Sequence, residues 1–248
     1  MLYPVPPVMV SCVDEEGRSN IMTAAWTGTI CSDPVMVSVS IRPERYSHAV
    51  IARTGEFVIN LTTESLTYAA DFCGVRSGRD VDKFAHLGLT KVPSRKVKAP
   101  SIGESPVCLE CVVTGIEKLG THDLFLARVV QVSVDESYLD EKGRFMLERA
   151  GLVAYVHGAY MSLGDKLGSF GYSVRKKAEG RSPEQSEKGS RRKADPAVKS
   201  SKEKSLNSKK RAFKKKSFQK EASGFLPSGR KPAGKISGNK KKKNNKNN

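Results

Sequence analysis

The sequence predicts a mainly β protein, an antiparallel barrel with a few short helices, followed by a disordered basic tail. Short segments rich in Val, Ile and Thr alternate with turns rich in Gly, Pro and Asp, which is typical of antiparallel strands. Residues 1–175 hold 18 Lys+Arg and 20 Asp+Glu, a net −2, whereas residues 176–248 hold 25 and 6, a net +19. We therefore expect a folded body over residues 1–175 and a basic tail over residues 176–248, whose burial cannot offset the entropy of ordering.

The first half of the body contains the clearest strand pattern. The Asp33-Pro34 turn precedes VMVSVSI, in which Val35, Val37, Val39 and Ile41 face one way and the intervening residues face the other. Ser47 and Thr63 are expected to cap two helices, and Gly55 is expected to end the first of them. The remaining elements expected in this half are strands at 8–13, 20–30 and 56–61 and a helix over 64–72.

The second half is dominated by two long strands, expected at 107–119 and 124–134 and joined by Gly120-Thr121-His122-Asp123. Both faces of the 124–134 strand are apolar, which predicts either a second layer or a subunit interface. Before these strands, Asp80 is expected to cap a helix that ends at Gly88. Residues 89–105 are expected to be irregular.

The composition indicates a soluble protein of the cytoplasm. Five cysteines, an odd number, do not suit a secreted disulfide framework. The first ten residues hold three prolines and no basic residue, so we expect no signal peptide, and no apolar run approaches the ~20 residues of a membrane span. Cys108 and Cys111 are expected to be core residues, because strand positions three apart point to opposite faces and zinc sites require four ligands.

Polar side chains gather at the end of the 35–41 strand. Ser38, Ser40 and Arg42 share a face that leads into Arg45 and Ser47. Guanidinium groups and hydroxyls suit an anionic group, most obviously a phosphate. The alternative is a solvated strand face whose arginines pair with Glu44.

Two segments, 20–26 (NIMTAAW) and 38–47 (SVSIRPERYS), resemble the flavin reductase-like domain of the FMN-binding split-barrel proteins, most closely the flavoredoxin-like branch. Segments 56–61, 77–84 and 163–171 fit the same family, so the resemblance covers about residues 1–175. It implies a Greek-key split barrel that forms a homodimer and binds FMN as its cofactor.

The resemblance also implies a role for each candidate residue. Arg42, Arg45, Ser47 and Lys83 are expected at the phosphate, and Asn20, Ser38 and Ser40 at the ribityl chain. The backbone of Thr23, Ala24 and Ala25 is expected at the edge of the ring system, with Trp26 or Tyr155 against its face. Trp26 as a core residue is an alternative, and His122 is either a turn residue or a site residue.

The resulting functional hypothesis is an FMN-dependent oxidoreductase of the NAD(P)H:flavin reductase type. It requires no acid–base pair, because the redox chemistry belongs to the flavin. One alternative is a flavoredoxin-type electron-transfer protein that a protein partner reduces. Another is a nucleic-acid-associated protein that uses the barrel as a scaffold. The basic tail is expected to bind RNA or another polyanion.

Overall fold

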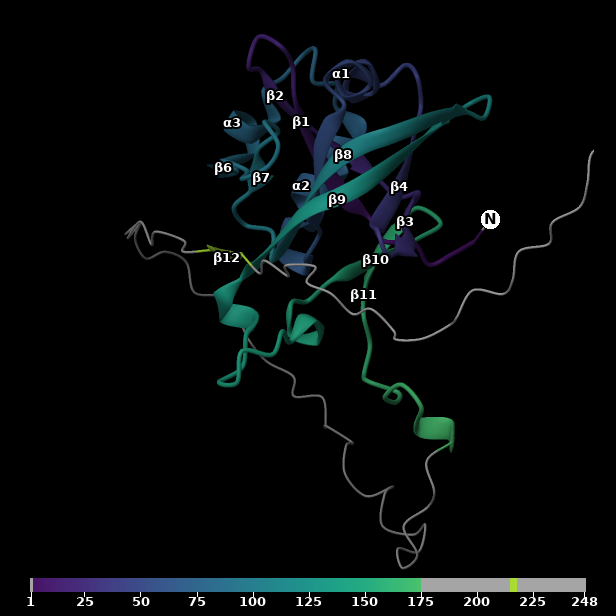
Figure 1. Cartoon of the computed structure of the whole chain (residues 1–248), viewed down its shortest axis with the longest axis vertical. Coiled ribbons are helices and arrows are strands. Elements are labelled where there is room, and N and C mark those ends of the chain that lie inside the picture. The colour runs from purple at the N-terminus through teal and green to yellow at the C-terminus, as the bar shows by residue number, and fades with distance from the viewer. Residues whose placement is uncertain (1, 175–214, 218–248) are drawn as a thin grey trace, which may run out of the picture. The chain divides into compact units, whose positions relative to one another are not determined.

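The computed structural model describes residues 2–174 and 215–217 (Figure 1). Seven strands of an eight-stranded antiparallel sheet lie in the order β2-β1-β5-β8-β9-β4-β3, and the eighth, β12 (Lys215–Ser217), pairs with β9 outside this order. These strands are β1 (Val8–Val13), β2 (Ser19–Ala24), β3 (Thr27–Ser32), β4 (Val35–Ile41), β5 (Glu56–Leu61), β8 (Val107–Lys118) and β9 (Asp123–Asp135). Figure 1 shows β8 and β9 as a long twisted hairpin.

The sheet curls around one hydrophobic core, so its two outer strands approach each other. Residues 20–30, expected as strand, form two strands that are interrupted at Ala25 and Trp26. These two strands, β2 and β3, lie at opposite ends of the sheet order, yet only two residues connect them. Side chains from β2 and β4 share a single buried cluster with those of β1, β5, β8 and β9. This arrangement confirms the predicted mainly antiparallel barrel with a few short helices.

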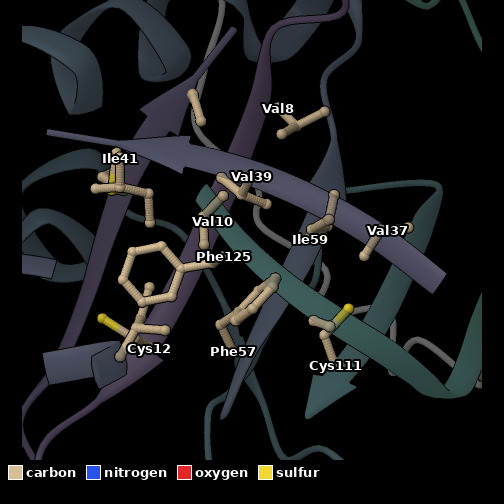
Figure 2. Packing of buried hydrophobic residues seen from close by; sticks show 14 of the residues in the cluster. Val8, Val10, Cys12, Val37, Val39, Ile41, Phe57, Ile59, Cys111 and Phe125 are labelled. Carbon is tan, nitrogen blue, oxygen red and sulfur yellow. The ribbon is translucent and has the colours of Figure 1, made fainter. Parts of the chain in front are cut away.

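The interior of the barrel is filled by aromatic and branched side chains. Phe57 and Phe125 are both fully buried and point into the same space, with Val39 close by (Figure 2). The alternation predicted for β4 is confirmed, because Val37, Val39 and Ile41 are buried. Val35 departs from it and is 47% exposed, since it directly follows the Asp33-Pro34 turn at the edge hairpin.

Helix α1 (Tyr46–Thr54) begins one residue before the predicted cap. Ser47 therefore does not cap it; the Ser47 hydroxyl instead accepts a hydrogen bond from Asn20 Nδ2 at 2.8 Å. Gly55 ends the helix as predicted, with a φ of 71° that favours glycine and an N–H bonded to the carbonyl of Ile51.

The next two helices have different starts from those predicted. A short 3₁₀ helix, Glu64–Leu66, follows Thr63, and α2 runs over Thr67–Val75. The side chain of Thr63 pairs with Ser65 and caps neither helix. Helix α3 (Lys83–Leu87) is capped by Asp82, which accepts from the N–H of Ala85 at 3.1 Å. The predicted cap, Asp80, lies two residues too early for this bond.

Residues 89–105 are more ordered than expected. They contain a short ladder between β6 (Lys91–Val92) and β7 (Ser101–Ile102). Glu110, which is 1% exposed, accepts hydrogen bonds from the backbone N–H groups of Arg95 and Lys96. A buried carboxylate that is fully hydrogen-bonded fixes a loop whose sequence carries no periodic pattern.

Short elements complete the described residues. The hairpin β10 (Val153–Val156) and β11 (Ala159–Ser162) follows the barrel, and 3₁₀ turns occupy Glu136–Tyr138, Leu147–Arg149 and Tyr172–Val174. Strand β12 (Lys215–Ser217) pairs with β9, although the sequence predicts no strand there. The remainder of the predicted disordered tail lies outside the described residues. No helix in the described part of the chain is long and apolar enough to cross a membrane.

Candidate functional site

A strongly basic cleft of about 330 Å³ lies beside β2 and the start of α1. Its lining includes four guanidinium groups, from Arg42, Arg45, Arg76 and Arg79, and one carboxylate, from Glu44. The other lining residues are Asn20, Met22, Tyr46, Ser47, Cys73, Val75, Ser77, Gly78 and Lys83. We call this space the basic cleft. Its excess of positive charge suits an anionic ligand.

Two buried polar side chains belong to the lining of the basic cleft. Asn20, on β2, is 5% exposed, and Ser47, in the first turn of α1, is 1% exposed. Their mutual hydrogen bond joins strand to helix. The loop at Gly78 packs directly on Asn20: a Cβ atom at Gly78 would lie 2.2 Å from Asn20 Oδ1. Glycine is therefore required where this loop approaches β2.

The arginine side chains around the basic cleft are exposed, and three of them contact the lining. Arg42 Nε lies 2.5 Å from Glu44 Oε1. Arg45 donates to the carbonyl of Gly74 at 3.0 Å, and Arg79 lies over the ring of Tyr46, 5.7 Å from its centroid. A guanidinium carries five N–H donors, so each retains donors for a ligand.

Glu44 is held ionised by its surroundings. Its own backbone N–H is the largest influence and lowers the pKa of the carboxyl, and the positive charges of Arg42 and Arg45 lower it further. Partial loss of hydration acts in the opposite direction without reversing the shift. The basic cleft thus contains a permanent negative charge at neutral pH.

Lys83 lines the basic cleft, but its ammonium group donates two of its hydrogen bonds to carbonyl groups inside the protein. Its side chain is 2% exposed, and Nζ donates to the carbonyls of Ile21 at 2.6 Å and Cys73 at 3.0 Å. Burial lowers the pKa of this ammonium group. Because an ammonium has three N–H donors, one remains for a ligand. The main observed role of Lys83 is to tie β2 to α2.

A smaller cleft of about 150 Å³ adjoins the basic cleft through Arg42 and Arg45, which line both. The rings of Trp26 and His122 lie 4.6 Å apart and form part of its wall. Trp26 is 45% exposed, so the alternative that it is a core residue is wrong. Small side chains at positions 23–25 line the same space.

A third cleft, of about 230 Å³, lies on the other side of Thr23 and Ala25. Tyr155 and Tyr160 line it with their rings 5.2 Å apart. Burial raises the pKa of Tyr160 to about 12, and the neighbouring carboxylate of Asp71 adds to this effect. Aromatic side chains therefore line both of the clefts that contain Thr23 and Ala25.

The geometry suits a ligand with an anionic end and a planar end. Arginines converge on one side, and small residues with aromatic neighbours lie on the other. Among the residues that the structure describes, no group of three or more His, Cys, Asp or Glu side chains is placed to hold a metal ion. Cys108 and Cys111 are both buried and belong to separate apolar clusters, which agrees with the predicted core role.

The family model described as the flavin reductase like domain matches residues 1–164. The chain belongs to the flavin reductase-like domain family. An uncharacterized protein of Pyrococcus abyssi is 36% identical over 137 residues, which cover 55% of this chain and 77% of that protein. Flavin-dependent oxidoreductase chemistry is therefore the function class of this chain.

Solved structures agree with this assignment. Flavoredoxin of Desulfovibrio vulgaris (Miyazaki F) is 34% identical, with a TM-score of 0.66, over 71% of this chain and 95% of that chain. The FMN-binding protein of Thermus thermophilus is 28% identical, with a TM-score of 0.58, over 67% and 90% of the two chains. Both likenesses support the split-barrel fold that the sequence predicts for this flavin reductase-like domain.

The site residues predicted for the flavin reductase-like domain all lie along this series of clefts. Five line the basic cleft: Asn20, Arg42, Arg45, Ser47 and Lys83. The smaller cleft contains Thr23, Ala24, Ala25, Trp26, Ser40 and His122, together with Arg42 and Arg45. Tyr155 lines the third cleft, and Ser38 lines a fourth that it shares with Ser40 and Trp26. Their roles toward a cofactor stay predictions.

The lining residues that sequence reasoning missed include Arg76, Arg79 and Tyr160. A signal was present for Arg79, because residues 77–84 already resemble the flavin reductase-like family. Tyr160 carries no comparable signal: its position depends on the β10–β11 hairpin, which places it opposite Tyr155.

We predict that Gly78→Ala weakens flavin binding by about tenfold or more, because a Cβ atom at this position must displace Asn20 or the loop that carries Arg79. Fluorescence titration with FMN measures the effect. Gly115→Ala is the matched control, since a Cβ atom at Gly115 meets only Leu126 Cδ1 at 3.7 Å, an ordinary contact distance, and Gly115 lines none of these clefts. Equal affinities for Gly78→Ala and the wild type would contradict the required close approach.

Proposed function

We propose that this chain binds FMN and acts as an oxidoreductase that accepts reducing equivalents from a nicotinamide cofactor. The observation that carries the proposal is the basic cleft, which adjoins a wall of small and aromatic residues at the link between β2 and β3. When bound, FMN supplies one-electron and two-electron redox chemistry, and the protein supplies binding and orientation.

The residues present fit FMN at both of its ends. Arg42 and Arg45 offer charged donors to the phosphate, and each charge-assisted hydrogen bond is worth ~1.5–3 kcal/mol. Two or three such bonds account for much of the ~8 kcal/mol of a micromolar affinity. The loop backbone at Gly78 lies so close to the buried amide of Asn20 that position 78 has room only for glycine.

At the planar end, the small side chains of Thr23, Ala24 and Ala25 permit close approach of a ring to the backbone. Trp26 and Tyr155 are the aromatic residues placed to cover such a ring and exclude water. Asn20, Ser38 and Ser40 provide amide and hydroxyl groups for the ribityl chain. We assign no side-chain acid or base, because the proposed chemistry requires none.

A second candidate is a flavoredoxin-type electron carrier that a protein partner reduces. The 34% identity to a flavoredoxin of Desulfovibrio vulgaris favours it. Stopped-flow mixing of the FMN-loaded protein with NADH and NADPH distinguishes the two candidates. Rapid loss of flavin absorbance with either nicotinamide supports the reductase, whereas reduction only by a protein donor supports the carrier.

We also propose that the chain forms a homodimer. Large apolar side chains are exposed near the β8–β9 hairpin tip and after the barrel, which is unusual for an isolated protein. They include Leu119, Met161, Leu163, Leu167 and Phe170. A second copy of the chain is the partner that we expect to cover them.

The basic tail is proposed to bind RNA or another polyanion. This proposal depends on composition alone, 25 Lys+Arg against 6 Asp+Glu over residues 176–248, since nearly all of the tail lies outside the described residues. It is separate from the proposed flavin chemistry, which we assign to the body.

We predict that Arg42→Ala weakens FMN binding by about 10- to 100-fold, the equivalent of one lost charge-assisted hydrogen bond. Riboflavin, which lacks the phosphate, should bind the variant as it binds the wild type. Arg53→Ala is the matched control, because Arg53 is equally exposed and lines no part of the basic cleft. Quenching of flavin fluorescence measures all affinities, and equal losses for FMN and riboflavin would refute the phosphate assignment.

Truncation after Arg175 is predicted to leave the dimer and the FMN affinity intact. Light scattering should give twice the mass of the truncated chain, and circular dichroism serves as the folding control. Polyanion binding should disappear, and in the full chain it should fall about 10³- to 10⁵-fold between 50 and 200 mM salt if ~6–10 phosphates are neutralised. A truncated monomer, or RNA affinity that survives the truncation, would count against the corresponding proposal.

A further inference from the structure

Among the described residues that line the basic cleft, Glu44 supplies the one carboxylate. This carboxylate forms an ion pair with Arg42, whose guanidinium group is proposed to bind the phosphate. Glu44 Oε1 is 2.5 Å from Arg42 Nε. The side chains of Arg42 and Glu44 are 53% and 60% exposed. An exposed ion pair of this kind contributes only about 0–1 kcal/mol to folding, so fold stability does not explain its position in the cleft.

The local backbone keeps Glu44 near Arg42. The N–H of Arg45 donates to the carbonyl of Arg42 at 3.0 Å and closes a tight turn, with Pro43 at its second position. Proline fixes its own φ, which suits this position of a turn. Only Pro43 therefore separates Arg42 from Glu44 in the chain, and a short tether gives an effective concentration that is commonly in the millimolar range.

A phosphate that binds the Nε face of Arg42 needs the N–H donor that Glu44 occupies, and only the Nη donors of Arg42 are left for it otherwise. Carboxylate and phosphate oxygens recognise the same face of a guanidinium group, so the two anions compete for it. If Glu44 stays in place, its negative charge also repels the phosphate dianion. Either way, the presence of Glu44 makes binding of an anionic ligand weaker than the arginines alone would allow.

We propose that Glu44 is an intramolecular competitor for the phosphate site, which weakens FMN binding and keeps the flavin exchangeable. This inference rests on the proposed binding of FMN in the basic cleft. It assigns to Glu44 a role in selectivity: the residue reduces the preference for phosphorylated over unphosphorylated flavin. It also makes the flavin a ligand that leaves the protein more readily than the four arginines suggest.

The test compares Glu44→Gln with the wild-type full-length chain in titrations with FMN and with riboflavin. Glutamine keeps the size of the side chain and removes its charge. We expect FMN to bind about three- to tenfold more tightly to the variant. This range begins within the free energy typical of an exposed ion pair and extends slightly above it. Riboflavin should bind both proteins equally.

Glu16→Gln is the matched control for the change in net charge. Glu16 is 63% exposed, pairs with Arg18 at 3.1 Å and lies outside the lining of the basic cleft. It should leave both affinities unchanged. Glu44→Asp keeps the charge on a shorter side chain and should give an FMN affinity between those of the wild type and Glu44→Gln.

A double-mutant cycle with Arg42→Ala tests whether competition acts through that guanidinium. Most of the gain from Glu44→Gln should disappear in the Arg42→Ala background. A gain of equal size in both backgrounds would overturn the competition, because it would indicate only a general electrostatic effect.

Other results of the Glu44→Gln titrations would also overturn the inference. FMN binding that is unchanged or selectively weakened by Glu44→Gln would overturn the inference, since Glu44 would then be a bystander or would position Arg42 for the phosphate. Equal gains for FMN and riboflavin would overturn it as well. A wild-type protein that binds neither flavin would instead overturn the proposed function, and this inference with it.

Discussion

The short link between β2 and β3 is the constraint on which the site depends. Two residues, Ala25 and Trp26, join the strands at opposite ends of the sheet order. A two-residue connection spans only ~7 Å, so the ends of the sheet must approach each other around the core. The hydrogen bond from the N–H of Ser40 to the carbonyl of Trp26, 2.9 Å long, holds the link against the end of β4. The clefts lie around this link because both edges of the barrel meet there.

Buried polar contacts then fix the helices around the same place. Asn20 bonds to Ser47 on α1, and the ammonium group of Lys83 bonds to carbonyls of β2 and α2. Such groups are costly to bury without partners, so each contact permits few alternative arrangements. The backbone segments that bear the exposed arginines are therefore fixed by these buried contacts. The arginine side chains themselves remain in solvent, where they can reorient toward a ligand.

The sequence predicts strands and the basic site well because both follow local patterns. The period-two alternation of β4 and the position of Arg42 after its last core residue require no knowledge of distant segments. The failures concern residues whose role is set by partners far along the chain. Ser47 looks like a helix cap, but its hydroxyl is used by Asn20, which lies 27 residues earlier. Lys83 is predicted at the phosphate, but its side chain is buried and bonded to carbonyls of β2 and α2, a role that depends on how these elements pack. Arg76 lines the basic cleft next to the loop at Gly78, which packs on Asn20 on β2, far away in the sequence.

The position of Trp26 has a spectroscopic consequence. It is the single tryptophan of the chain, and it lies at the link between β2 and β3, beside His122 and away from the core. The indole emission of this protein therefore originates at one place, the edge of the clefts. Changes in that emission report on events at the link, while the packing of Phe57 and Phe125 remains invisible to it. An unfolding curve recorded by indole emission would follow the loss of structure at the link between β2 and β3. One recorded by far-ultraviolet circular dichroism would follow the sheet as a whole.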